Sequence, residues 1–106
     1  MESQMAATGS FRSFIASPDV YKVIAESGDT RVILAMWKPG QRDEWHAHPA
    51  NTVVYACDDM RLYFPDGQSI DSSFKIGHIE IQPRVQSHSF ENKTSRECKV
   101  LFVERD

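Results

Sequence analysis

The sequence predicts an all-β domain, and three observations support that prediction. Its apolar runs are short and rich in Val, Ile, Phe and Tyr, residue types that favour strands. Turn-forming residues bound almost every run, and the runs recur at about the ten-residue spacing expected of antiparallel sheets. No segment shows a sustained helical repeat with caps. The chain of 106 residues is long enough to bury one core of its own and too short for two domains.

The strands follow in chain order from these runs and from the turns between them. Ser27, Gly28 and Asp29 form the first turn signal, and the second run ends at Pro39 and Gly40. Later breaks fall at residues 65–67 and at residue 77. The expected strands are residues 20–26, 30–37, 52–58, 60–64, 68–71, 79–82, 86–90 and 97–104.

A small all-β domain has to protect the edges of its sheets. At this size a double-layered or closed sheet is one of the few solutions, so we expect a jelly-roll barrel with an interior. Residues 1–10 are small and polar, and we expect them to form a flexible tail. Residues 11–106 then form the single domain.

The composition limits the classes of partner that we expect. The net charge is −3, so no basic surface is expected for nucleic acid or for anionic lipid, and a small molecule or another protein is the expected partner. The N-terminus lacks the basic and apolar regions of a secretion signal, and no apolar stretch reaches membrane-spanning length. Cys57 and Cys98 lie in strand-like surroundings that favour buried free thiols. We therefore expect a cytoplasmic protein.

Two histidines, His46 and His48, stand one residue apart in the stretch "EWHAHPA". Side chains alternate across a strand, so both would point to the same face, with Ala47 opposite. If that face is the interior, two buried imidazoles need partners, and a metal ion satisfies both at once. Hydrogen-bonded core histidines are the alternative.

A longer pattern surrounds this pair. Residues 40–48 read G(X)5HXH, and residues 77–92 read G(X)5P(X)4H(X)3N. With these two motifs the sequence resembles the cupin superfamily. The resemblance covers nearly the whole chain, because residues 11–37 and 98–104 fall where the outer strands of a cupin would lie.

The resemblance implies one divalent metal ion inside the barrel. Cupins hold it with the two histidines of the first motif, an acid a few residues later and the histidine of the second motif. Those positions are His46, His48, Thr52 and His88 in this sequence, so the acid is missing. Three neutral imidazoles would leave the metal charge uncompensated and positions open for water, dioxygen or an anionic chelating substrate.

Such a site is similar to that of a minority of cupin enzymes, including cysteine dioxygenases and β-diketone-cleaving dioxygenases, which use Fe(II). We therefore expect Fe(II) and dioxygenase-like chemistry on a small diketone, thiol or carboxylate. Zn, Ni or Mn could bind in its place, since imidazole suits several of these metals. A ligand-binding or sensing domain and a metal-dependent isomerase or lyase are the alternatives, because one fold hosts many chemistries.

Four further residues are expected near the site. Thr52 would either place its hydroxyl behind the metal-binding histidines or be a packing residue. Phe90 would help to make the barrel interior apolar. Arg61 and Tyr63 could contact a substrate, or serve as a surface charge and a packing ring. Val85 takes the place of a glycine usual in the second motif, so we expect an altered turn. Family habit and apolar outer strands favour a homodimer.

Overall fold

The computed structural model of the chain describes residues 11–56, 60–72 and 77–106. The expected tail, residues 1–10, and Cys57 lie outside them. The strands are β1 (Tyr21–Ser27), β2 (Thr30–Trp37), β3 (His46–His48), β4 (Thr52–Ala56), β5 (Met60–Tyr63), β6 (Ser69–Ser72), β7 (His78–Gln82), β8 (Val85–Glu91) and β9 (Cys98–Arg105).

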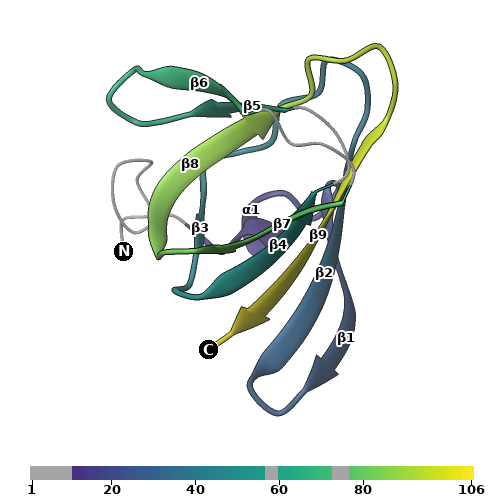
Figure 1. Cartoon of the computed structure of the whole chain (residues 1–106), viewed down its shortest axis with the longest axis vertical. Coiled ribbons are helices and arrows are strands. Elements are labelled where there is room, and N and C mark those ends of the chain that lie inside the picture. Colours follow the sequence, from purple (N-terminus) through teal and green to yellow (C-terminus); the bar gives the residue numbers. More distant parts are fainter. Residues whose placement is uncertain (1–10, 57–59, 73–76) are drawn as a thin grey trace.

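These strands form two antiparallel sheets that lie one above the other (Figure 1). One sheet has the order β1-β2-β9-β4-β7 and the other the order β3-β8-β5-β6. The predicted all-β, double-layered jelly roll is confirmed. Among the described residues no strand pairing joins the two sheets, so the barrel is not closed by hydrogen bonds there.

The core lies between the sheets because the strands alternate buried and exposed positions. On β9 the buried side chains are Cys98, Val100, Phe102 and Glu104, each followed by a more exposed residue. Trp37 is fully buried at the end of β2 and packs edge-to-face on Phe90 of β8, with ring centroids 5.8 Å apart. Each large side chain buried in this way stabilises the fold by about 1.5–3 kcal/mol.

Residues 11–16 are not an outer strand, and that part of the prediction is wrong. Ser13–Ala16 form a single helical turn, α1, in which the amide of Ser17 donates to the carbonyl of Ser13 at 2.9 Å. Ser13 and Ser17 are the buried positions, as expected of one helix face rather than of a strand. One turn is too short to produce a periodic sequence signal. It is the one helix in the described ranges, and it is too short to cross a membrane.

Asn92, the last residue of the second motif, joins two loops. Its side chain is fully buried, and its amide nitrogen lies within 3.1 Å of the carbonyl oxygens of Trp37 and Lys38 and 2.7 Å from that of Arg96. Its amide oxygen accepts a bond from the backbone N–H of Thr94 at 2.8 Å. The shape of the loop before the first motif thus depends on a residue of the second motif.

Replacing Asn92 with alanine is expected to lower the free energy of unfolding by about 2–4 kcal/mol, because buried carbonyl and N–H groups would lose their partner. Urea unfolding of the metal-free protein measures this. Asn51→Gly is the matched control, since Asn51 is exposed in a left-handed turn at φ 61° that glycine also adopts. Equal stability of the Asn92 variant and the control would contradict the role assigned to Asn92.

Candidate metal centre

Three histidines converge between the sheets. His46 on β3 lies opposite His88 on β8, and His48 follows two residues later on the same face. A register irregularity between His46 and His48 places His48 opposite Val85. The three side chains are at most 1% exposed, and one potential ligand atom from each lies within 4.8 Å of the others. The predicted convergence of the three imidazoles is confirmed.

Hydrogen bonds to the Nδ1 atoms determine which nitrogens face the centre. Nδ1 of His46 lies 2.7 Å from the carbonyl oxygen of Glu44, which can only accept, so Nδ1 carries the proton. Nδ1 of His48 lies 2.7 Å from the Glu104 carboxylate and donates to it in the same way. In the neutral rings Nε2 is therefore the atom with a free lone pair.

The Nε2 atoms of His48 and His88 are buried and have no hydrogen-bond partner among the described residues. A buried polar atom without a partner costs free energy. A divalent transition metal would satisfy both atoms at once, and imidazole nitrogen is one of its usual ligands. The residues present therefore fit a metal ion.

The protonation of these rings also suits a metal. Burial lowers the pKa of His48 well below its ordinary value, and the neighbouring His46 adds to the effect. Burial likewise lowers the pKa of His88, again with contributions from the nearby histidines. Both imidazoles are thus neutral at pH 7, which is the form that binds metals.

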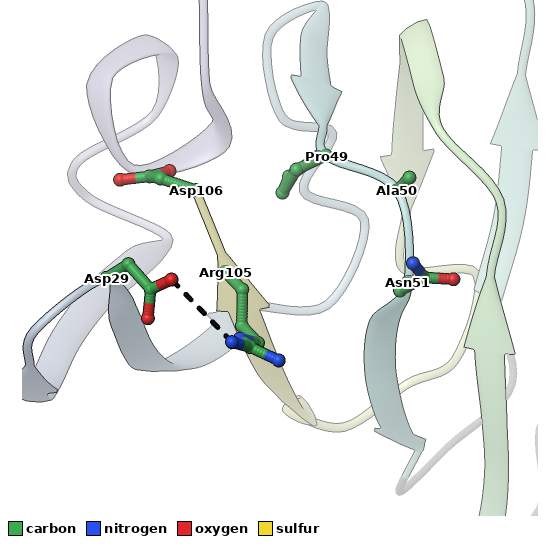
Figure 2. Close-up of a pocket in the computed structure, with 6 residues that line it drawn as sticks. All are labelled: Asp29, Pro49, Ala50, Asn51, Arg105 and Asp106. Carbon is green, nitrogen blue, oxygen red and sulfur yellow. Dashed lines mark ion pairs between the residues drawn. The ribbon is translucent and has the colours of Figure 1, made fainter.

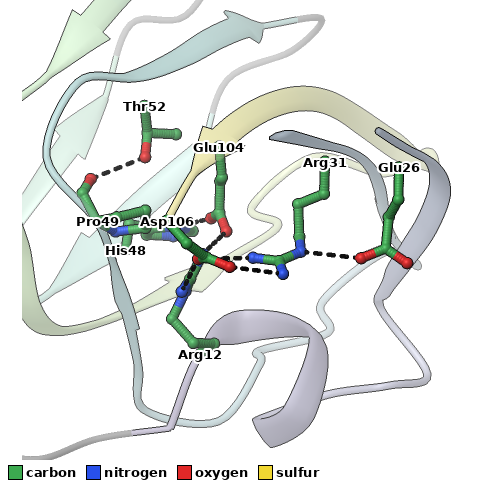
Figure 3. Close-up of polar contacts among 8 residues, drawn as sticks. All are labelled: Arg12, Glu26, Arg31, His48, Pro49, Thr52, Glu104 and Asp106. Carbon is green, nitrogen blue, oxygen red and sulfur yellow. Dashed lines mark hydrogen bonds and ion pairs between the residues drawn. The ribbon is translucent and has the colours of Figure 1, made fainter. Parts of the chain in front are cut away.

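Glu104 orients His48 from the opposite sheet (Figure 3). Its second oxygen accepts a bond from the Arg12 guanidinium at 2.5 Å, and Arg12 also contacts Asp106 at 2.7 Å. Burial raises the pKa of Glu104, while the bond from Arg12 acts in the opposite direction. A carboxylate behind a histidine fixes the ring and makes its free nitrogen a better metal ligand.

Asp43 is the second buried carboxylate, and it receives four hydrogen bonds. One oxygen accepts from the Tyr21 hydroxyl at 2.7 Å and from the Trp37 indole at 3.2 Å. The other accepts from the backbone N–H of Phe90 at 2.9 Å and from the Ser89 hydroxyl at 3.0 Å. Burial raises the pKa of Asp43, and the bonds from Tyr21, Phe90 and Ser89 oppose that rise.

Tyr21 lies between this carboxylate and His46. Its hydroxyl oxygen is 3.2 Å from Nε2 of His46, and its ring is 2% exposed. Burial, together with the charge of Asp43, raises the pKa of the Tyr21 hydroxyl well above its ordinary value. With no metal bound, the hydroxyl therefore keeps its proton at neutral pH.

Aromatic rings enclose the histidines. Phe102 stacks on His48, with ring centroids 5.0 Å apart and ring planes 13° from parallel. The ring centroids of Phe90 and His88 are 4.5 Å apart. The expected place of Phe90 in the interior is therefore confirmed. Such walls lower the local dielectric and exclude water, which strengthens electrostatic interactions at the centre.

The other expected site residues have different surroundings. Thr52 is fully buried, but its hydroxyl donates to the carbonyl of Pro49 at 2.8 Å (Figure 3). Tyr63 donates to the Glu91 carboxylate, and the Arg42 guanidinium stacks on its ring at 3.8 Å. Arg61 lies partly exposed on β5. Whether any of these three touches a ligand stays a prediction.

Val85 does not have the positive φ that a glycine would permit at its position. Asn51 is the one non-glycine residue with positive φ among those described, so the valine is not strained in the left-handed region. It begins β8 and pairs with His48. Val85 thus begins β8 one residue before the expected strand at residues 86–90, and the altered turn stays a prediction.

A cavity of about 370 Å³ lies at one end of the sandwich (Figure 2). It is lined by Asp29, Pro49, Ala50, Asn51, Arg105 and Asp106. Arg105 pairs with Asp29 across it at 3.7 Å. None of the three histidines lines this cavity, so it is distinct from the candidate metal centre.

The fold of the chain is similar to that of solved cupin domains. A cupin domain protein from Bordetella pertussis Tohama I matches with a TM-score of 0.74 and 22% identity, over 82% of this chain and 92% of that one. A cupin-2 domain protein from Shewanella frigidimarina matches with a TM-score of 0.56 and 25% identity, over 81% and 79%. The chain has the cupin fold.

A likeness of fold extends to a protein described as a lyase. A structure described as a DMSP lyase matches with a TM-score of 0.53 and 15% identity, over 76% of this chain and 40% of that one. No family model matches the sequence, and no curated protein matches it either. The resemblance seen in the two motifs is therefore supported by the fold rather than by overall sequence similarity.

Three site residues were not identified from the sequence: Tyr21, Asp43 and Glu104. Glu104 had a usable signal, because it shares the inner face of its strand with Cys98, Val100 and Phe102. An acid on such a face needs a partner inside the protein. Asp43 lies three residues before His46 in a loop, where no periodicity predicts its direction. Tyr21 belongs to a strand whose other residues are exposed.

Proposed function

We propose that this cupin binds one divalent metal ion through the Nε2 atoms of His46, His48 and His88, and that it is a dioxygenase-like enzyme for a small chelating anion. The observation that supports this most directly is the pair of buried Nε2 atoms, on His48 and His88, that lack a partner among the described residues. Fe(II) is the favoured ion, with Zn, Ni or Mn as the others that this ligand type suits. Bound Fe(II) would supply redox chemistry with dioxygen.

The chain's own residues would hold and orient the reactants. Glu104 fixes the ring of His48, the carbonyl of Glu44 fixes that of His46, and Phe90 and Phe102 keep water away. The ligands are neutral, but Asp43 and Glu104 place negative charge directly behind them, and Arg12 offsets that of Glu104. The metal charge is thus less exposed than the ligand set alone implies, and a substrate anion would still gain from it.

Purified wild-type protein loaded with Fe(II) under anaerobic conditions is expected to hold about one ion per chain, as in other mononuclear sites. His46→Ala is expected to lose that ion, because one of three ligands is removed. Elemental analysis after gel filtration measures the content. His78→Ala is the matched control, since His78 is the fourth histidine and is exposed. Equal metal content in wild type and His46→Ala would refute the metal site.

A Lewis-acid lyase or isomerase is the second candidate, favoured by the match to a structure described as a DMSP lyase. The two candidates differ in their need for dioxygen. An oxygen electrode and the Fe(II)-loaded protein, tested on β-diketones, thiols and α-hydroxy acids, separate them. Substrate turnover without oxygen uptake would favour the second candidate. Binding without turnover would favour a sensing domain.

A homodimer is the assembly that we propose, through the outer face of the five-stranded sheet. Tyr55 of β4 lies beside Ile79 of β7 and Leu101 of β9, and Ile79 and Ile81 are 62% and 67% exposed. One border of this face carries the exposed Lys22 and Lys99. At the opposite border of the face, Arg105 pairs with Asp29 at 3.7 Å.

A second copy turned about a twofold axis parallel to the sheet would place the apolar rows of the two copies on each other. Isologous contacts of this kind form most dimers. The thiol of Cys98 donates to the amide oxygen of Asn92 at 3.0 Å, and we propose with the dimer a cytoplasmic setting, where reduced thiols persist.

Ile81→Lys is expected to weaken dimerisation by roughly 30-fold, as for a hot-spot residue worth about 2 kcal/mol. Sedimentation over a range of protein concentrations measures the effect. Ile15→Lys is the control, because Ile15 is 55% exposed on α1, away from this sheet face. A wild-type protein that stays monomeric at high concentration would refute the dimer, and an interface elsewhere would leave the Ile81 variant dimeric.

A further inference from the structure

The contact between Tyr21 and His46 has too few protons to be a satisfied hydrogen bond. Asp43 already accepts bonds from the Trp37 indole and the Phe90 amide, which can only donate, so it is an acceptor toward Tyr21 as well. The single hydroxyl proton of Tyr21 then lies in the 2.7 Å bond to Asp43. The oxygen turns a lone pair toward His46.

His46 also presents a lone pair in this contact. Its Nδ1 proton is used in the bond to the carbonyl of Glu44, so in the neutral form of the ring, which is the form that binds a metal, Nε2 carries no proton. Two acceptor atoms thus face each other at 3.2 Å inside the protein. Such a contact is unfavourable unless a cation or an additional proton lies between the atoms.

A metal ion held by the histidines would be that cation. Two neighbouring ligand atoms bonded to one metal ion at about 2.0–2.1 Å lie about 2.9 Å apart in octahedral geometry, which leaves positions open for substrate, and about 3.3 Å apart in tetrahedral geometry. The distance of 3.2 Å between the Tyr21 oxygen and Nε2 of His46 lies between these values. Tyr21 therefore occupies a ligand's position relative to His46, on the side that faces Asp43.

We propose that the phenol oxygen of Tyr21 is a fourth protein ligand of the metal, beside His46, His48 and His88, and that Asp43 accepts its proton. This inference rests on the proposed metal site. The O–H bond of Tyr21 breaks, the proton moves along the existing hydrogen bond to Oδ2 of Asp43, and the oxygen's electron pair binds the ion. The chain thereby supplies the anionic ligand that the cupin motif lacks at Thr52.

A phenolate bound to ferric iron absorbs visible light by charge transfer, and its ring vibrations are enhanced in the resonance Raman spectrum. The protein is loaded anaerobically with Fe(II) and oxidised with stoichiometric ferricyanide. We expect the band in wild type and its loss in Tyr21→Phe. The chain has three tyrosines, Tyr21, Tyr55 and Tyr63, so Tyr55→Phe/Tyr63→Phe leaves Tyr21 alone and should keep the band.

The outcomes separate this inference from the proposed function. Iron bound in wild type without a tyrosinate band would overturn the role of Tyr21 and leave the three-histidine site intact. A band that persists in Tyr21→Phe would overturn it too. If Tyr21→Phe does not fold, the double variant still decides, because loss of its band refutes the ligand. A wild type that takes up no metal refutes both proposals.

Discussion

Replacing Asp43 with alanine is expected to lower the free energy of unfolding by about 3–5 kcal/mol. The variant would leave the buried Tyr21 hydroxyl, the Trp37 indole and the Phe90 amide without their acceptor. A loss of this size is a large part of the roughly 5–15 kcal/mol that stabilises a typical domain. Denaturant unfolding of the metal-free protein, with chelator present, measures it apart from any metal effect.

Asp66→Ala is the matched control for Asp43. Its carboxylate accepts a single backbone bond, from Gln68 at 3.0 Å, in an exposed turn. The control is expected to change stability by about 0.5 kcal/mol or less, as most surface substitutions do. Similar stability of the two variants would show that the four bonds to Asp43 contribute little to the fold.

Replacing Glu104 with glutamine is expected to weaken metal binding by about 10- to 100-fold, as for other partners of metal-binding histidines. The amide keeps the size of the side chain, but its NH2 group must face either Nδ1 of His48 or the Arg12 guanidinium, and both of these donate. His48 would then lose its fixed orientation. Competition with a coloured chelator for Zn(II) or Ni(II) measures the affinity.

The chain contains its own control for Glu104. Glu80 and His78 form an exposed carboxylate–histidine pair at 2.8 Å, away from the three-histidine group, and Glu80→Gln should leave metal affinity unchanged. Wild-type affinity in Glu104→Gln would mean that the orientation of His48 does not depend on the carboxylate. Reduced affinity in both variants would point to a general effect of charge.

Most of the strands were predictable because their side-chain pattern depends on local sequence. The cupin resemblance places Thr52 inward, and alternation then puts Val54 on the same face and Tyr55 on the opposite one. The burial of Thr52 and Val54 and the exposure of Tyr55 confirm this. α1 could not be predicted, since one helical turn leaves no repeat. Its position depends on a tertiary contact, because Arg12, the residue before the helix, forms an isolated β-bridge with Ala47 of β3.

The candidate site was predictable only where spacing places residues together. His46, His48 and His88 were found because two motifs mark their positions on neighbouring strands. The groups behind them come from distant parts of the chain, as Glu104 lies 56 residues beyond its partner His48 and Tyr21 lies 25 residues before His46. Such pairings are set by the stacking of the two sheets and leave no local pattern.

That stacking has a consequence for metal exchange. The three histidines belong to one sheet, while Tyr21 and Glu104 reach them from the other, and the rings are almost completely shielded from solvent. An ion could enter or leave only when the layers separate transiently. Its release should therefore be slow and limited by the rate at which the two sheets separate. A bound ion should also slow amide hydrogen exchange in β8 and β9 together.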